Sequence, residues 1–145
     1  MKIIYYDETY LKPCADLLMK HYNDHDFNCN FTKERACCYL QEIIFKPRFI
    51  GFLLLEKETL IGFAFCHMRT WSDADELYID EFIMTNTHQK KGLGSKVLDF
   101  INTYATSFQL AGITTTTNVI ALTQFYQKND FLAHDISFLY KGLKS

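Results

Sequence analysis

A glycine-containing turn, residues 89–94 (QKKGLG), combines residue types that could bind a phosphate. It follows a run rich in strand formers, 76–84, and precedes a helix-like run, 96–106. A turn that begins a helix presents backbone N–H groups and the positive end of the helix dipole to an anion. Gly92 and Gly94 allow close backbone approach and positive φ, which a residue with a Cβ resists. Positive charge around the turn comes from Lys90, Lys91 and Lys96.

Two other phosphate-binding motifs do not fit this turn. A P-loop needs Gly-Lys-Ser/Thr, whereas Gly94 is followed by Ser95 and Lys96. A dinucleotide-binding fingerprint needs a third glycine or alanine where Val97 stands. Two glycines alone are a weak signal, so a phosphate-binding α/β domain of another kind, such as a nucleotide binder, remains an alternative.

Residues 89–94 match the Gln/Arg-x-x-Gly-x-Gly/Ala signature of the GNAT superfamily of acetyl-CoA-dependent N-acetyltransferases, which the chain resembles from about residue 49 to 131. The run 77–84 (LYIDEFIM) is similar to the strand before that motif. Residues 118–131 (NVIALTQFYQKNDF) are similar to the family's later Asn…Phe-Tyr-x-Lys-x-Gly-Phe segment. The block 62–98 most resembles the spermidine/spermine N-acetyltransferases, with some likeness to aminoglycoside acetyltransferases. The resemblance implies one GNAT domain over residues 1–145, an α/β fold whose central mixed sheet is flanked by about four helices.

The resemblance also implies catalytic residues, and amine basicity explains why they are needed. An alkylamine with a pKa near ~10.4 is protonated at pH 7, and its neutral form costs about 4.6 kcal/mol. A carboxylate must therefore accept a proton, and Asp80 and Glu81 stand in the strand where the polyamine acetyltransferases carry two adjacent acidic residues. Neighbouring side chains of a regular strand point to opposite faces, so only one should face the acceptor unless a bulge re-aims both. Tyr126 matches a tyrosine that commonly protonates the departing thiolate.

The implied cosubstrate is acetyl-CoA, without a metal. Backbone groups after Glu81 would pair with the pantetheine arm, and the turn would hold the pyrophosphate. Asp130 stands where the family usually has glycine, and the spacing to Tyr126 leaves open whether Asn118 or Val119 meets pantetheine. The implied cofactor-binding residues are Phe82, Ile83, Met84, Gln89, Lys90, Lys91, Gly92, Leu93, Gly94, Ser95, Asn118 and Tyr126.

The acceptor is less defined. The loop 69–76 carries Trp71 together with acidic residues, and an acidic, aromatic-lined mouth would suit a polyamine, an aminoglycoside or a lysine side chain. The implied substrate-binding residues are Asp80, Glu81 and Trp71. Acidic loops are also ordinary solvated loops. A catalytically silent acyl-CoA-binding or regulatory domain is the alternative function.

Composition agrees with one compact enzyme domain of 145 residues, 48% hydrophobic and 16% aromatic. A net charge of −2 and no basic face argue against nucleic acid, and no apolar run approaches the ~20 residues that span a bilayer. Five irregularly spaced cysteines and the start of the chain favour a reduced, cytoplasmic setting. The cluster 21–26 (HYNDHD) has metal-ligand residue types but lacks a further ligand at a sensible spacing, so a polar loop is favoured. A homodimer is compatible with the resemblance.

Hydrophobic spacing predicts alternating elements. Helices are expected from Asp7 or Thr9 to Met19, from the N-cap Thr32 to Ile43, from Lys96 to about Phe108, and over 119–129. Strands are expected over 3–6, 49–55, 60–68, 76–84, 113–117, 131–133 and 136–140.

Overall fold

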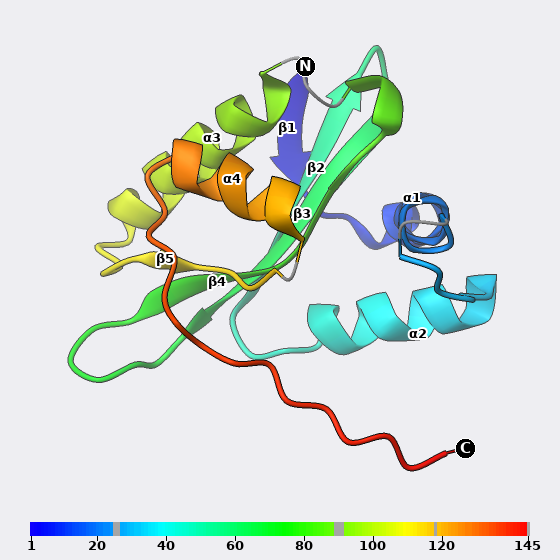
Figure 1. Cartoon of the computed structure of the whole chain (residues 1–145). Coiled ribbons are helices and arrows are strands. Elements are labelled where there is room, and N and C mark those ends of the chain that lie inside the picture. The colour runs from blue at the N-terminus through cyan, green and yellow to red at the C-terminus, as the bar shows by residue number, and fades with distance from the viewer. Residues whose placement is uncertain (25–26, 89–91, 118, 145) are drawn as a thin grey trace. The chain divides into compact units, whose positions relative to one another are not determined.

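The computed structural model describes residues 1–24, 27–88, 92–117 and 119–144 (Figure 1). Within them, five strands form one sheet in the order β1-β2-β3-β4-β5. Neighbours from β1 to β4 are antiparallel, whereas β4 and β5 are parallel, so the sheet is mixed as predicted. The strands are β1 (Lys2–Tyr5), β2 (Phe49–Glu56), β3 (Thr59–Arg69), β4 (Glu76–Met84) and β5 (Ile113–Thr114).

Four α-helices occur in the described residues, and side-chain caps were predicted for the first two. The Asp7 side chain accepts a hydrogen bond from the Thr9 backbone N–H at 2.8 Å, which begins the short 3-10 helix before α1. Thr32 Oγ1 accepts from the Arg35 N–H at 3.1 Å and caps α2. The helical elements are η1 (Glu8–Tyr10), α1 (Leu11–Tyr22), α2 (Lys33–Ile44), η2 (Asn86–His88), α3 (Leu93–Ser107) and α4 (Ile120–Lys128).

The two faces of the sheet pack against different helices. Helices α1 and α2 lie on one face and α3 lies on the other (Figure 1). On the first face, Leu53, Phe63 and Phe65 of the sheet join Leu18 and Leu40 of the helices in one buried cluster. On the second face, the Phe52 ring meets those of Phe100 and Tyr104 of α3 at 5.4 and 5.3 Å between centroids. Burial of this apolar surface fixes which side chains of β4 face α1 and α2.

The hairpin of β2 and β3 agrees with its prediction. Its two-residue turn, Lys57 and Glu58, has φ of 50° and 68°. Positive φ at both central positions is the type I′ geometry, which matches the twist of the flanking strands. At the other edge, described pairing of β4 with β5 covers Leu77↔Ile113 and Tyr78↔Thr114, whereas β4 continues to Met84.

The chain divides into two compact units, Met1–Thr115 and Thr116–Ser145, so the expectation of one domain over 1–145 stays a prediction. In the second unit, α4 forms as predicted, but the strands expected over 131–133 and 136–140 do not. Residues rich in β-formers become strands only where another backbone supplies ladder partners. The backbone hydrogen bonds described in this stretch are local: the Phe131 N–H donates to the Tyr126 carbonyl and the Ile136 N–H to the His134 carbonyl, both at 3.0 Å.

Candidate active site

A bulge in β4 places the two predicted carboxylates on the same face of the sheet. The register pairs Phe65 with Glu81 and Cys66 with Ile79, so Asp80 is the extra residue. A bulge of this kind interrupts strand alternation and re-aims a side chain. The expectation from strict alternation, that Asp80 and Glu81 point to opposite faces, is therefore wrong here. Both side chains find their partners on the side of α1 and α2.

The Asp80 carboxylate is buried between two nitrogen groups. Its side chain is 5% exposed. Lys46, just after α2, places Nζ 2.5 Å from Oδ1, and His67 of β3 places Nδ1 2.7 Å from Oδ2. An opposite charge at such a distance stabilises a buried carboxylate. Asp80 is thus held by a cation and an imidazole.

The Glu81 carboxylate accepts hydrogen bonds from two phenols instead. Tyr22 Oη lies 3.0 Å from Oε1 and 2.9 Å from Oε2, and Tyr39 Oη donates to Oε1. Glu81 is 8% exposed. Burial raises the pKa of Glu81 and the nearby Asp80 charge adds to this, while the hydrogen bonds from Tyr39 and Tyr22 oppose it. Burial and the Glu81 charge also raise the pKa of Tyr39, which keeps its hydroxyl a donor.

The start of α3 is where the sequence predicts an anion site. Gly92 is its N-cap and has φ of 75°, and no atom of the described residues lies within 4 Å of a Cβ built there. Gly92 therefore has room beside its backbone. Gly94 lies inside the first turn of α3, so positive φ, expected for both glycines, occurs at Gly92 and not at Gly94. Leu93, Gly94 and Ser95 are the first helical residues, whose N–H groups point out of the helix end.

Four of the predicted cofactor residues, Gln89, Lys90, Lys91 and Asn118, lie outside the described residues. Phe82, Ile83 and Met84 lie on the part of β4 past its last described pair with β5. Thr115, which follows β5, donates from Oγ1 to the Ile79 carbonyl at 3.1 Å.

Tyr126 belongs to the second unit, on α4. Its ring centroid lies 5.2 Å from that of Phe125 and 5.1 Å from that of Phe131. Asp130, after the helix, has φ of 71°, the left-handed conformation that glycine adopts most easily. The aspartate thus keeps the turn that the family glycine would make. Asp and Asn are the residues that best tolerate this conformation after glycine.

Two carboxylates in the region of the loop between β3 and β4 form ion pairs with arginines. Arg48 Nη1 lies 2.7 Å from Asp75 Oδ2, and Arg69 Nη2 lies 3.3 Å from Glu76 Oε1. The Arg69 guanidinium also lies 5.9 Å from the ring centroid of Trp71, which is 61% exposed. Arginines thus already balance two of the loop carboxylates, and a role of Trp71 in binding the acceptor stays a prediction.

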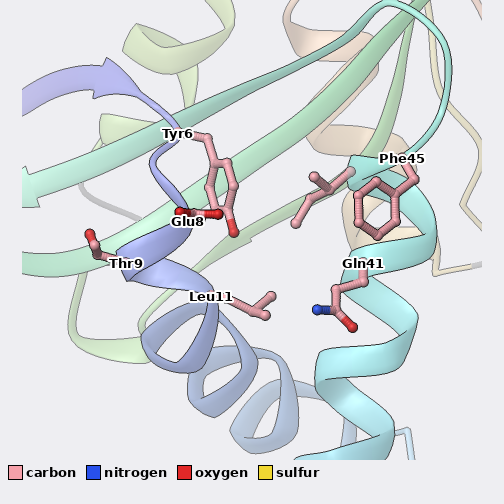
Figure 2. A pocket seen from close by; sticks show the side chains of 7 residues that line it. Tyr6, Glu8, Thr9, Leu11, Gln41 and Phe45 are labelled. Carbon is pink, nitrogen blue, oxygen red and sulfur yellow. The ribbon is translucent and has the colours of Figure 1, made fainter.

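A cavity of about 420 Å³ lies elsewhere on the face of α1 and α2. Figure 2 shows Tyr6 and Leu11 on one side of it, with Gln41 of α2 and Phe45 just after α2 on the other. It contains none of the predicted site residues. The lining residues are Tyr6, Glu8, Thr9 and Leu11 with Gln41, Ile44 and Phe45.

No group of three or more metal-ligating side chains occurs in the part of the chain that the structure describes. His25 and Asp26 of the 21–26 cluster lie outside it, whereas His21 packs its ring 4.9 Å from that of Tyr22 and 4.7 Å from that of Phe27. Burial lowers the pKa of His21. None of the described helices has the length and apolarity to cross a membrane.

The fold is shared with solved acetyltransferases. A possible acetyltransferase from Clostridium difficile 630 superposes with a TM-score of 0.81 at 10% identity, covering 99% of this chain and 98% of that one. The aminoglycoside N-acetyltransferase AAC(6')-Iy, solved in complex with CoA, gives 0.76 at 13% identity, covering 99% and 95%. An aminoglycoside acetyltransferase from an uncultured soil metagenomic sample, in complex with sisomicin, gives 0.74 at 17% identity, covering 99% and 96%.

The family model of the Acetyltransferase (GNAT) family matches residues 12–131. The chain belongs to this family and is an N-acetyltransferase. The predicted family, fold class and enzyme class are thereby confirmed. No curated protein matches the sequence.

The sequence interpretation missed two of the residues that contact the acidic pair. Tyr22 and Tyr39 are 59 and 42 positions away from Glu81 along the chain, so no local motif joins them. Each lies on the stripe of its helix that packs against the buried cluster. A tyrosine on the core-facing side of a helix needs a hydrogen-bond partner for its hydroxyl. The core-facing positions of Tyr22 and Tyr39 were therefore the signal in the sequence that could have pointed to them.

Proposed function

We propose that the protein transfers the acetyl group of acetyl-CoA to a primary amine by direct attack. The amine belongs to a polyamine-like or aminoglycoside-like small molecule, or to a protein. The observation that carries the proposal is Glu81, a buried carboxylate with no ion-pair partner among the described residues, on the strand that leads to the start of α3. A carboxylate whose pKa is raised by burial is a stronger base than an exposed one.

In the proposed reaction, the substrate ammonium gives one proton to the Glu81 carboxylate and becomes a neutral amine. The amine nitrogen attacks the thioester carbonyl carbon, and the C–S bond breaks as the C–N bond is completed. Tyr126 gives its phenol proton to the departing thiolate and regains one from the new amide nitrogen. The proton on Glu81 returns to solvent, so the products are an acetamide, CoA thiol and one proton.

The proposed acetyl-CoA site is the start of α3 together with β4 beyond its described pairs with β5. Gly92 supports it, because its positive φ and the open space beside it leave room for a pyrophosphate. Ser95 and Gly94 would add N–H groups at the positive end of the helix dipole. Acetyl-CoA supplies the activated acetyl group and a thiolate leaving group.

The deciding experiment is a thiol-release assay with acetyl-CoA and a panel of amines. The panel contains spermidine, an aminoglycoside, a lysine peptide and an aryl amine. Thiol release that depends on one of these amines supports the proposal and assigns the acceptor class. Binding of CoA in calorimetry without turnover on any of them would favour a silent acyl-CoA-binding domain.

The proposed cofactor site predicts that Gly92→Val strongly weakens CoA binding while the chain still folds. A branched Cβ fills the space beside the turn and disfavours φ of 75°. Calorimetry measures CoA affinity, and circular dichroism checks the fold. Gly112→Val is the matched control, because a Cβ there also meets no atom within 4 Å but lies away from the start of α3. Unchanged CoA affinity in Gly92→Val would contradict the site.

The proposed acid predicts that Tyr126→Phe lowers kcat by about 10²-fold with little change in CoA affinity. The thiolate is a modest base, so the lower end of general-acid effects is expected. Single-turnover kinetics separates chemistry from product release. Full kcat in an assay limited by chemistry would leave Tyr126 as a packing residue of α4.

A further inference from the structure

Three separate elements converge on one carboxylate. Tyr22 is the last residue of α1, Tyr39 lies within α2, and Glu81 lies on β4. The Tyr22 hydroxyl lies within 3.0 Å of both carboxylate oxygens, and the Tyr39 hydroxyl bonds Oε1. Two donors from two helices fix the orientation of the carboxylate more tightly than one donor could.

The charges around Glu81 make these phenols the groups that favour its ionised form. Helices α1 and α2 contribute Tyr22 and Tyr39, and β4 contributes the like charge of Asp80. The nearby cation Lys46 and the imidazole of His67 are bonded to Asp80. Among the described residues no Lys, Arg or His forms an ion pair with Glu81. Burial and Asp80 oppose its ionisation, and the two hydroxyls support it.

Aromatic packing holds the two phenols in place. The Tyr22 ring contacts that of Phe27 at 5.2 Å and that of Phe31 at 5.9 Å, and Phe31 contacts the Tyr39 ring at 5.8 Å. Phe31 is itself fixed by Asn23, which exchanges two hydrogen bonds with its backbone, at 2.8 and 2.9 Å. The rings are therefore rigid supports for their hydroxyls rather than mobile surface groups.

We propose that Tyr22 and Tyr39 are positioning residues that hold the Glu81 carboxylate oriented and ionised, ready to accept the ammonium proton. This rests on the proposed role of Glu81 as the base. Both tyrosines act through Glu81 and take no part in the transfer itself. The α1–α2 segment thereby sets the pH range in which the enzyme works.

The test is a titration of the Glu81 side-chain carboxyl by carbon NMR in the full chain, assigned with Glu81→Gln. Tyr22→Phe and Tyr39→Phe should each move the midpoint upward by about one pH unit, and the double variant further. Tyr6→Phe is the control. Its half-buried ring contacts Phe65, the sheet partner of Glu81, but no contact of Tyr6 with Glu81 is described. Midpoints that stay at the wild-type value in folded Tyr22→Phe and Tyr39→Phe would overturn the proposal.

Kinetics gives a second readout that separates positioning from packing. The acidic limb of the plot of kcat/KM against pH should move to higher pH together with the NMR midpoint. The plateau at high pH should stay within a few-fold of wild type. A lower plateau with an unmoved limb would mean that the tyrosines only pack. If Tyr39→Phe fails to fold, 3-fluorotyrosine at position 39 is a stronger donor and should move the midpoint downward. If wild type acetylates no amine, the proposed function fails, and the NMR titration still tests the tyrosine pair.

Discussion

Asp80 and Glu81 are consecutive residues on one face of the sheet, yet their carboxylates have different partners. Asp80 bonds the Lys46 ammonium and the His67 imidazole, whereas Glu81 bonds the phenols of Tyr22 and Tyr39. A cation balances a buried negative charge, and a neutral hydroxyl only solvates it. Groups whose surroundings differ in this way take different roles in acid–base chemistry. The partners, and not the place in the strand, single out Glu81 as the candidate base.

The largest expected effect comes from Glu81→Gln. The amide cannot accept the ammonium proton, so kcat/KM for an alkylamine should fall by about 10²–10⁴-fold. The loss should be much smaller for an aryl amine, which is already neutral at pH 7. Steady-state assays with both amine classes measure the two ratios. Equal losses for both classes would mean that Glu81 shapes the site without handling the proton.

The same assay locates the base if Glu81 is not it. Glu81→Gln should abolish the acidic limb of the kcat/KM profile. If the limb survives in Glu81→Gln and disappears in Asp80→Asn, the comparison of the two carboxylates is reversed. If it survives in both variants, His67, which is 2.7 Å from Asp80, is the next candidate.

A smaller effect, of opposite sign to that of the tyrosine variants, is expected from Asp80→Asn. It removes the like charge that helps raise the pKa of Glu81 and leaves the Lys46 ammonium nearby. The acidic limb should therefore move downward by on the order of one pH unit. The double variant Asp80→Asn with Lys46→Met removes the cation as well, so its limb should return toward wild type. An upward shift in Asp80→Asn would contradict the assigned charge arrangement.

The elements that could be predicted from the sequence are those that a local residue pattern determines. The β2–β3 hairpin follows from β-formers on both sides of a polar turn, and the start of α2 follows from Thr32. The family motif located β4 and the start of α3. The bulge was not predictable, because the residue types around Asp80 do not mark which residue loses its partner. The partners of Glu81 depend on how α1 and α2 pack. Residues that are so far apart in the chain form no motif of recognisable spacing.

The strands expected over 131–133 and 136–140 do not form, because the prediction used β-propensity alone. A strand also needs the hydrogen bonds of a neighbouring backbone. At Asp130, where the family usually has glycine, φ of 71° shows that the left-handed conformation is kept. Local propensity thus predicted which residues can form a strand, but not whether they pair with another backbone.

The smallest expected effect is on stability, and its sign follows from the Glu81 pKa. Because this pKa is raised above its ordinary value of 4.5, the folded state holds the proton more tightly than the unfolded state. The stabilisation is complete below pH 4.5 and is lost as pH rises through the folded pKa. Glu81→Gln cannot ionise, so the free energy of unfolding of wild type should fall relative to that of the variant across this window. The slope is about 1.36 kcal/mol per pH unit where only the native state keeps the proton.

Urea denaturation of wild type and Glu81→Gln from pH 4.5 to 8 measures this slope. Glu42→Gln, an exposed carboxyl on the helix of Tyr39, is the control. A wild type that gains stability over Glu81→Gln as pH rises would mean that the two phenols outweigh burial, with the Glu81 pKa lowered instead of raised.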